Sequence, residues 1–449
     1  MSSILSPAAS LEPALSDILG GALTSGDASY AVDGLVATFV AAPGSAEQIA
    51  AALAAADEHG AAVVPWGAGR HMALGNVPRR YDLALSTTKL DRVVEYEPAD
   101  LVLTVEAGMT MGQLQALLAE HRQFLPIDAP PEATVGGLLA AGVSGPSRHA
   151  YGLPRDWLIG CRVAHVDGTI SKGGGRVVKN VAGYDLPKLA IGSLGTLGVI
   201  VEATVKVAPL PPRHETAFVT CASLEAAGAL VSAADDRGLA LRAVAIADVA
   251  AASALLNVPF AGAALAGFWL AGPASAVERT RRELGQLGGE TQRLDDAASE
   301  QWWAQLSEPN VVESAMTLRA SLTPTSVVEF MRHLAEIGRE LGVSIATVAY
   351  PTTGLVLASV AEAPPGELVR IVERARKFAV EAGGTLVITS APVDVRKRIN
   401  VWGDPSAGSR PGESATGQAP GSALSLMRRV KEQFDPRGTI NPGRFMGGL

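Results

Sequence analysis

The richest concentration of potential chemistry in the sequence lies between residues 171 and 206, where two glycine clusters flank basic side chains. Residues 173–175 are all glycine, and a second glycine-rich turn at 192–198 leads directly into the β-branched run 199–201. Glycine lets the backbone approach a ligand closely and adopt positive φ angles. A strand after such a turn would hold the backbone N–H groups rigidly. We therefore expect this segment to grip a flat, polar cofactor that carries phosphate.

Another glycine-rich loop follows a predicted strand at residues 62–66. Gly67 and Gly69 form a Gly-x-Gly pattern that is typical of the start of a dinucleotide-binding motif. A third glycine, an immediate helix and an acidic residue on a second strand are missing. Two interpretations stay open: a plain turn, or a loop that binds phosphate through its N–H groups. His71 could equally be an exposed loop residue.

A third candidate segment, residues 128–145, is rich in small residues around one short predicted helix that begins at Thr134. The first N–H groups of a helix have no partner within it and lie at the positive end of its dipole, so they could bind a diphosphate. Alternatively, Gly136, Gly137 and Ala140 are small because the helix packs tightly. The sequence alone leaves the two interpretations equal.

These segments resemble the flavin-binding domain of the vanillyl-alcohol-oxidase-like (PCMH-type) FAD enzymes. Residues 173–189, GGGRVVKNVAGYDLPKL, look most like the FAD-binding E subunits of bacterial glycolate oxidases. The resemblance covers about 35–212, and the tail 434–445, FDPRGTINPGRF, matches the family's end. The resemblance implies that the following residues bind FAD: Trp66, Gly67, Ala68, Gly69, Arg70, His71, Pro131, Thr134, Gly136, Gly137, Ala140, Gly142, Ser144, Gly145, Tyr151, Gly152, Arg155, Asp156, Gly198, Val199 and Ile200.

The resemblance also implies how the flavin is held. Relatives with a covalent flavin use a histidine at a position that aligns roughly with Arg70, and His71 is one place away. We therefore expect noncovalent FAD, with Arg70 or backbone amides facing a phosphate.

The candidates for catalysis are less well marked. Catalytic 2-hydroxy-acid dehydrogenases of this superfamily carry a metal-binding HxGDGNxH-like motif, whereas residues 349–356 read AYPTTGLV and offer no His or Asp. We predict no metal site. Arg319 is the best candidate to bind a substrate carboxylate, because a guanidinium can bind one bidentately; an ordinary surface ion pair is the alternative. Lys179 and Tyr184 could bind substrate or flavin, or be surface and packing residues.

The resemblance implies a subunit of a glycolate oxidase (dehydrogenase) complex that oxidises a 2-hydroxy acid to the 2-oxo acid by hydride transfer to FAD. The implied partners are a homologous FAD-binding catalytic subunit and an iron–sulfur subunit that takes the electrons. Cys161 and Cys221 are the only cysteines, and a cluster usually needs four thiolates, so this chain cannot hold one unaided. A stand-alone flavin oxidoreductase and a flavin-less structural subunit are the alternatives.

Bulk properties exclude other classes of function. The formal net charge is −8, which argues against binding to nucleic acid. The N-terminus lacks both the basic region and the long apolar core of a secretory signal, and no apolar run reaches about 18 residues. We expect a cytoplasmic protein that reaches the membrane only peripherally, through its complex.

The predicted elements give an α+β protein in four parts. A lead-in at 1–34 precedes two small α+β lobes at 35–212, where Ser45 and Thr110 are expected to cap helices. Strands and amphipathic helices alternate over 213–395, which indicates a ferredoxin-like duplication that forms a cap domain. Residues 396–449 are expected to hold a mobile low-complexity loop at 404–423, a helix at 424–434 and a turn-rich tail.

Overall fold

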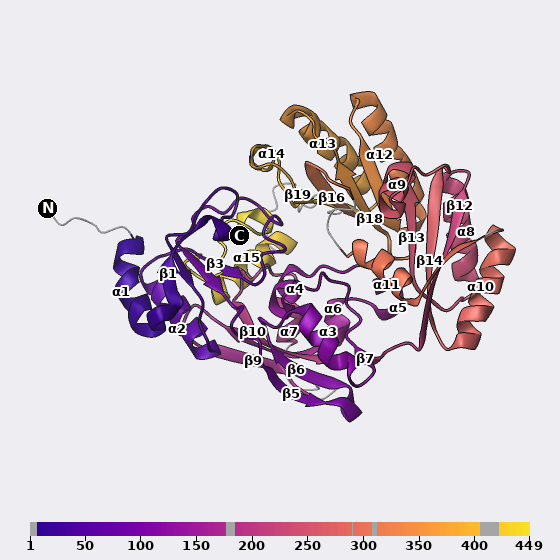
Figure 1. The fold of residues 1–449 in the computed structure, drawn as a ribbon. Helices are drawn as coiled ribbons and strands as arrows, with labels where there is room; N and C mark the ends of the chain where they lie inside the picture. The colour runs from indigo at the N-terminus through magenta and orange to yellow at the C-terminus, as the bar shows by residue number, and fades with distance from the viewer. Residues whose placement is uncertain (1–6, 177–184, 290, 308–311, 405–421) are drawn as a thin grey trace.

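The computed structural model describes residues 7–176, 185–289, 291–307, 312–404 and 422–449. Two small α+β lobes lie side by side, and a large sheet covered by helices stands against them (Figure 1). The α+β fold class expected from the sequence is confirmed. The expected mobile loop lies almost entirely outside the described residues. The four-part domain division stays a proposal.

The first lobe is a four-stranded sheet in the order β1-β2-β4-β3, in which β2, β4 and β3 run parallel. Its strands are β1 Leu23–Ser25, β2 Phe39–Ala41, β3 Val63–Trp66 and β4 Leu83–Ser86. Two helices, α1 Pro7–Leu19 and α2 Ala46–Glu58, bury apolar side chains with this sheet. The Ser45 hydroxyl caps α2 by accepting from the N–H of Gln48.

The second lobe is a five-stranded antiparallel sheet in the order β5-β6-β10-β8-β9. Its strands are β5 Val93–Glu97, β6 Val102–Glu106, β8 Leu158–Ala164, β9 Ile170–Gly174 and β10 Val199–Lys206. Helices α3 Met111–Ala119 and α4 Val135–Ala141 pack on it. Thr110 and Gln113 form the predicted capping box of α3. Val199 and Val201 of β10 share the core of α2, so the two lobes are packed together.

Short elements connect the lobes to the cap. Helices α5 Arg148–Tyr151, α6 Pro154–Trp157 and α7 Leu186–Ala190 flank β8 and β9. A two-stranded ribbon, β7 Gln123–Phe124 with β11 Ala208–Pro209, precedes the cap sheet.

The cap is one antiparallel sheet of eight strands in the order β15-β12-β14-β13-β17-β18-β16-β19. Its strands are β12 Arg213–Cys221, β13 Leu241–Asp248, β14 Ala264–Gly272, β15 Gln292–Asp295, β16 Met316–Ser321, β17 Ile345–Tyr350, β18 Leu355–Val360 and β19 Thr385–Ser390. Each half reads strand-helix-strand-strand-helix-strand, with the second strands β13 and β17 joined at the centre. This topology is the predicted ferredoxin-like duplication.

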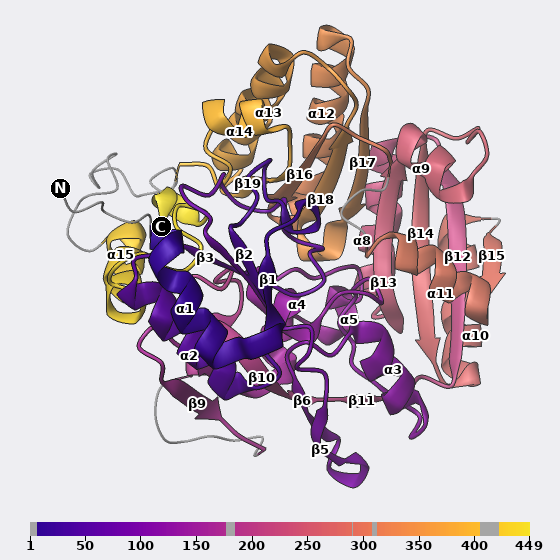
Figure 2. The ribbon, with the colours of Figure 1, turned by 60° about the vertical axis from the view of Figure 1, so that its left-hand side comes forward.

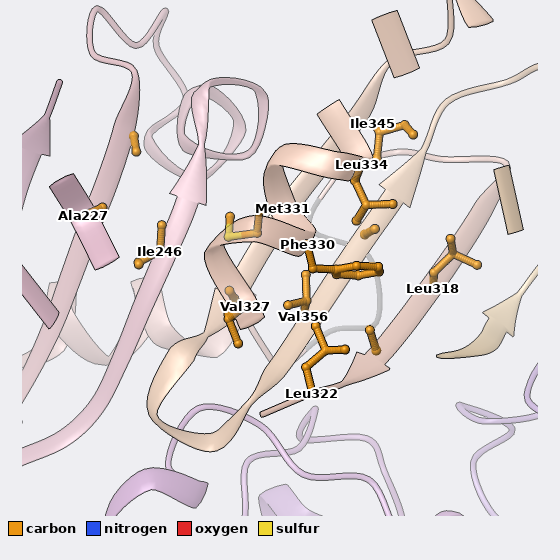
Figure 3. Packing of buried hydrophobic residues seen from close by; sticks show 14 of the residues in the cluster. Ala227, Ile246, Leu318, Leu322, Val327, Phe330, Met331, Leu334, Ile345 and Val356 are labelled. Atoms are coloured by element: carbon orange, nitrogen blue, oxygen red, sulfur yellow. The ribbon is translucent and has the colours of Figure 1, made fainter. Parts of the chain in front are cut away.

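Helices cover both faces of the cap sheet (Figure 2). One face packs against α8 Leu224–Asp236, α10 Ala274–Gly288, α12 Val327–Leu341 and α13 Pro365–Glu381. Phe330, Met331 and Leu334 of α12 lie against Leu318 and Val356 of the sheet (Figure 3). The other face packs against α9 Val249–Leu256 and α11 Asp296–Gln305. In the described ranges, no helix is long and apolar enough to cross a membrane.

The chain returns from the cap to the first lobe at its C-terminus. After α14 Val393–Arg398 and α15 Ala423–Phe434, the tail runs alongside β3, where Ile440 forms a parallel bridge with Val63. The N–H of Val63 donates to the carbonyl of Thr439 at 2.8 Å, and the N–H of Asn441 donates to the carbonyl of Val63 at 2.8 Å. The tail therefore extends the first sheet beside the glycine-rich loop.

Candidate flavin site

A pocket lies where the two lobes and the C-terminal tail meet, between the loop after β3, helix α4 and the turn before β10. It brings together most of the cofactor residues expected from the sequence: Trp66, Gly67, Ala68, Gly69, Arg70, His71, Thr134, Gly136, Gly137, Ala140, Gly198, Val199 and Ile200. Three segments that are distant in sequence thus form one concave surface.

The loop after β3 brings three small residues, Gly67, Ala68 and Gly69, to the pocket wall. Gly67 touches the second lobe so closely that an added Cβ would lie 2.0 Å from the Thr134 hydroxyl oxygen. Gly69 has φ +73°, a conformation that favours glycine. Within the described part of the chain, the N–H groups of Gly67, Ala68 and Gly69 have no hydrogen-bond acceptor. Such N–H groups suit the oxygens of a diphosphate.

Helix α4 decides between the two interpretations that the sequence left equal. Its first N–H groups, which could have bound an anion, are bonded within the protein. The N–H of Val135 donates to the Met109 carbonyl at 2.9 Å and that of Gly136 to the Ala107 carbonyl at 2.8 Å. That of Gly137 donates to the Thr134 hydroxyl at 3.3 Å. The bonding favours tight packing, because the residues that follow β6 supply the acceptors, and α4 offers the pocket a surface of small residues.

The turn before β10 is fixed to the end of α4. The N–H of Leu194 donates to the carbonyl of Ala140 at 2.8 Å, and that of Gly192 donates to the carbonyl of Leu139 at 3.0 Å. Val199 and Ile200 then enter the second sheet, paired with β8. The turn is therefore rigidly placed, as a binding surface for a flat ring requires.

Eight of the expected residues lie outside this pocket: Ser144 and Gly145, which line an adjoining cavity described below, and six others. Pro131 accepts from the N–H of Gly112, Gly142 caps α4 with φ +64°, and the Tyr151 carbonyl accepts from the Trp157 indole. Gly152 and Leu153 lead into α6, where the Asp156 carboxylate accepts from the N–H of Leu153 at 2.8 Å. The remaining residue of the six, Arg155, is exposed.

A second cavity of about 240 Å³ adjoins the pocket and shares Arg70, His71 and Leu138 with it. Ser144 and Gly145 line this cavity instead of the first pocket. Its other walls come from the cap strands, including Arg319 of β16. The structure thus brings Arg319 next to the loop 67–72, which no sequence pattern indicated.

The adjoining cavity is positively charged but contains one neutral imidazole. Burial, and then the positive charges of Arg70 and Arg319, lower the pKa of His71 to about 4. His71 is therefore neutral at pH 7, and its buried Nε2 has no hydrogen-bond partner in the described structure. Burial also lowers the pKa of Arg319, with a smaller contribution from Arg148. Burial raises the pKa of Asp128, which also lines the cavity.

Two expected residues, Lys179 and Tyr184, lie outside the described residues. Both cysteines, Cys161 and Cys221, are buried and free. Tyr350, in the segment that replaces the relatives' metal motif, is buried and donates to the Leu306 carbonyl at 3.1 Å. Across the described ranges, no group of three or more His, Cys, Asp or Glu side chains could hold a metal ion.

The sequence interpretation missed two polar residues of the pocket, Asn441 and Arg444, which come from the tail. Both are buried, with 4% and 3% of their surface exposed. The sequence showed these polar residues among the turn-forming residues of the tail, but a local sequence does not show where a tail docks.

Comparisons with known proteins agree with the pocket. Residues 37–174 match the family model described as an FAD binding domain, and residues 413–445 match that of FAD linked oxidases, C-terminal domain. The glycolate oxidase subunit GlcD of Bacillus subtilis is 25% identical over 90% of this chain and 88% of its own length. The glycolate oxidase subunit GlcE of Escherichia coli is 43% identical over 26% of this chain and 35% of its own length.

The fold has a close structural counterpart as well. The crystal structure of p-cresol methylhydroxylase with substrate bound superposes with a TM-score of 0.75 at 14% identity, over 99% of this chain and 97% of that one. The fold and pocket therefore define a flavoprotein oxidoreductase with the PCMH-type architecture. The chain is therefore similar to the FAD-linked oxidases in two separate segments, and it is an FAD-dependent oxidoreductase.

Replacing Gly69 with Asp should abolish FAD binding, because it places a carboxylate and a Cβ where N–H groups face the pocket at a positive φ. The visible absorbance of the purified variant measures its flavin content. Gly342→Asp is the matched control, since Gly342 has φ +67° and open space around it at the end of α12. Equal flavin contents in both variants would mean that the loop is misassigned.

Proposed function

We propose that this chain is the FAD-binding subunit of a glycolate oxidase type complex that oxidises 2-hydroxy acids and passes electrons to an iron–sulfur partner subunit. Its similarity to two different glycolate oxidase subunits supports the complex. The observation that carries the substrate class is Arg319, a half-buried cation that lines the cavity next to the flavin pocket. The bound flavin would supply the hydride acceptor.

Arg319 is suited to a small carboxylate. Within the described residues, the side chain of Arg319 has no hydrogen bond or ion pair. Its neighbours on β16, Leu318 and Ala320, are buried. A guanidinium without a carboxylate partner is costly to bury and binds a substrate carboxylate bidentately. A cavity of about 240 Å³ has ample room for a small 2-hydroxy acid.

His71 would contact the other end of such a substrate. Because its ring is neutral near pH 7 and its Nε2 has no partner in the described structure, it can accept a hydrogen bond from the substrate hydroxyl. The positive charges of Arg70 and Arg319 would stabilise negative charge that develops on that oxygen. Lys179 and Tyr184 remain proposed contributors on the sequence argument alone.

We further propose that FAD is held without a covalent bond. The expected linkage position carries Arg70, and the pocket offers backbone N–H groups instead. Acid precipitation separates the two forms, because a covalently bound flavin stays with the precipitated protein.

The isolated chain should oxidise glycolate at least about 100-fold more slowly than the assembled complex. The segment 349–356 lacks the metal-binding motif, and the loss of general acid–base catalysis typically costs about this much in rate. Two buried free cysteines also leave the chain without ligands for a cluster. Dye-linked glycolate oxidation, with and without candidate partner subunits, measures the difference. Equal turnover by the lone chain would instead favour a stand-alone oxidoreductase.

Replacing Arg319 with Leu should raise the KM for glycolate about 10- to 100-fold in the assembled complex, because one charge-assisted contact to the carboxylate is lost. The KM of Arg319→Lys should lie between those of the wild type and Arg319→Leu. The exposed Arg339→Leu, on helix α12, serves as the matched control. Flavin content should not change, and an unaltered KM in Arg319→Leu would place the carboxylate elsewhere.

A further inference from the structure

The C-terminal tail brings a buried guanidinium to the wall of the flavin pocket. Nη2 of Arg444 donates to the carbonyls of Met72 and Leu74, each at 2.7 Å. These carbonyls belong to the same glycine-rich loop that presents its N–H groups to the pocket. Nη1 of Arg444 is also buried but has no hydrogen-bond partner in the described part of the chain.

The charges around Arg444 do not balance. Burial, and then the positive charge of Arg396, lowers the pKa of Arg444. Arg396 donates to the carbonyls of Ala73 at 3.2 Å and Gly75 at 3.1 Å. Arg396 forms a buried ion pair with Asp33. The ion pairs of the described residues therefore leave the guanidinium of Arg444 uncompensated. A buried charge of this kind is costly unless an anion neutralises it.

Asn441 adds a second unsatisfied group to the same wall. Its backbone N–H donates to Val63, and its Nδ2 donates to the carbonyl of Leu194 at 2.5 Å, so the side chain is fixed in direction. Its Oδ1 is buried and has no donor among the described residues. The tail therefore offers the pocket one positive charge and one hydrogen-bond acceptor.

We propose that Arg444 neutralises the diphosphate of FAD, with Asn441 accepting from a donor of the same cofactor. The C-terminal tail is then part of the cofactor site and closes it. FAD joins an anionic diphosphate to N–H donors on its rings, which matches a guanidinium and an amide oxygen on one wall. The proposal rests on the flavin pocket and is independent of the substrate and partners proposed above.

The test compares two flavins on the chain after its cofactor has been removed. FAD carries the diphosphate and riboflavin does not. Arg444→Gln should weaken FAD binding about 10- to 100-fold, the size expected for a lost charge-assisted contact, while riboflavin affinity stays at the wild-type value. Arg444→Lys should retain part of the FAD affinity, since it keeps the charge but loses the fork. Flavin fluorescence quenching gives both dissociation constants.

Arg437→Gln is the matched control, because Arg437 lies in the same tail but is exposed and binds Asp57 on the surface. It should bind both flavins as the wild type does. Equal losses for FAD and riboflavin in Arg444→Gln, or no loss for either, would overturn the proposal. Should Arg444→Gln be insoluble, a second measurement is the competition of inorganic pyrophosphate with FAD. Pyrophosphate should compete more weakly for Arg444→Lys than for the wild type. Equal competition would refute the assignment. Failure of the wild type to bind FAD would refute the pocket itself.

Discussion

One buried ion pair holds the flavin pocket together. Lys431 of α15 donates to the Asp435 carboxylate at 2.5 Å and to the carbonyls of Thr196 and Ile440 at 2.7 and 3.0 Å. Asp435 in turn accepts from the N–H groups of Thr439 and Ile440, each at 2.8 Å. A buried pair recovers its desolvation cost only when its other donors and acceptors are satisfied, as they are here. The pair thereby joins helix α15, the tail and the turn before β10, and it fixes the tail at Ile440, next to Asn441.

The cap reaches the pocket through two further arginines. Arg396 crosses to the loop 67–75, and Arg242 of β13 donates to the Ser147 hydroxyl at 3.1 Å while its guanidinium lies 3.8 Å from the Trp269 ring centre. These contacts hold the cap sheet over the loop, so that Arg319 lines the same cavity as His71. The flavin pocket and the proposed substrate cavity therefore adjoin each other and share Arg70, His71 and Leu138. The arrangement explains why neither domain alone would form the proposed active site.

Much of this fold could be predicted because its signals are local. Ser45 and Thr110 marked two helix starts. The central strand β13 was missed, since both of its faces are buried and apolar: Ala243, Ala245 and Ala247 lie on one face and Val244 and Ile246 on the other, so no apolar-to-polar alternation marks it. The satisfied N–H groups of α4, the docking of Arg444 and the approach of Arg319 to His71 all depend on contacts between distant segments. Such contacts leave no pattern in a single sequence.

Hydrogen–deuterium exchange of the cofactor-free and FAD-loaded chain tests the central claim most directly, because it reports every segment that the cofactor orders. Binding should slow exchange in the loop 67–72, the turn 192–198 and the tail 435–445 together, since all three form one pocket. The outer cap helices α10 and α12 should exchange at unchanged rates. Protection confined to the two lobes, with the tail exchanging equally in both states, would contradict a pocket closed by the C-terminus.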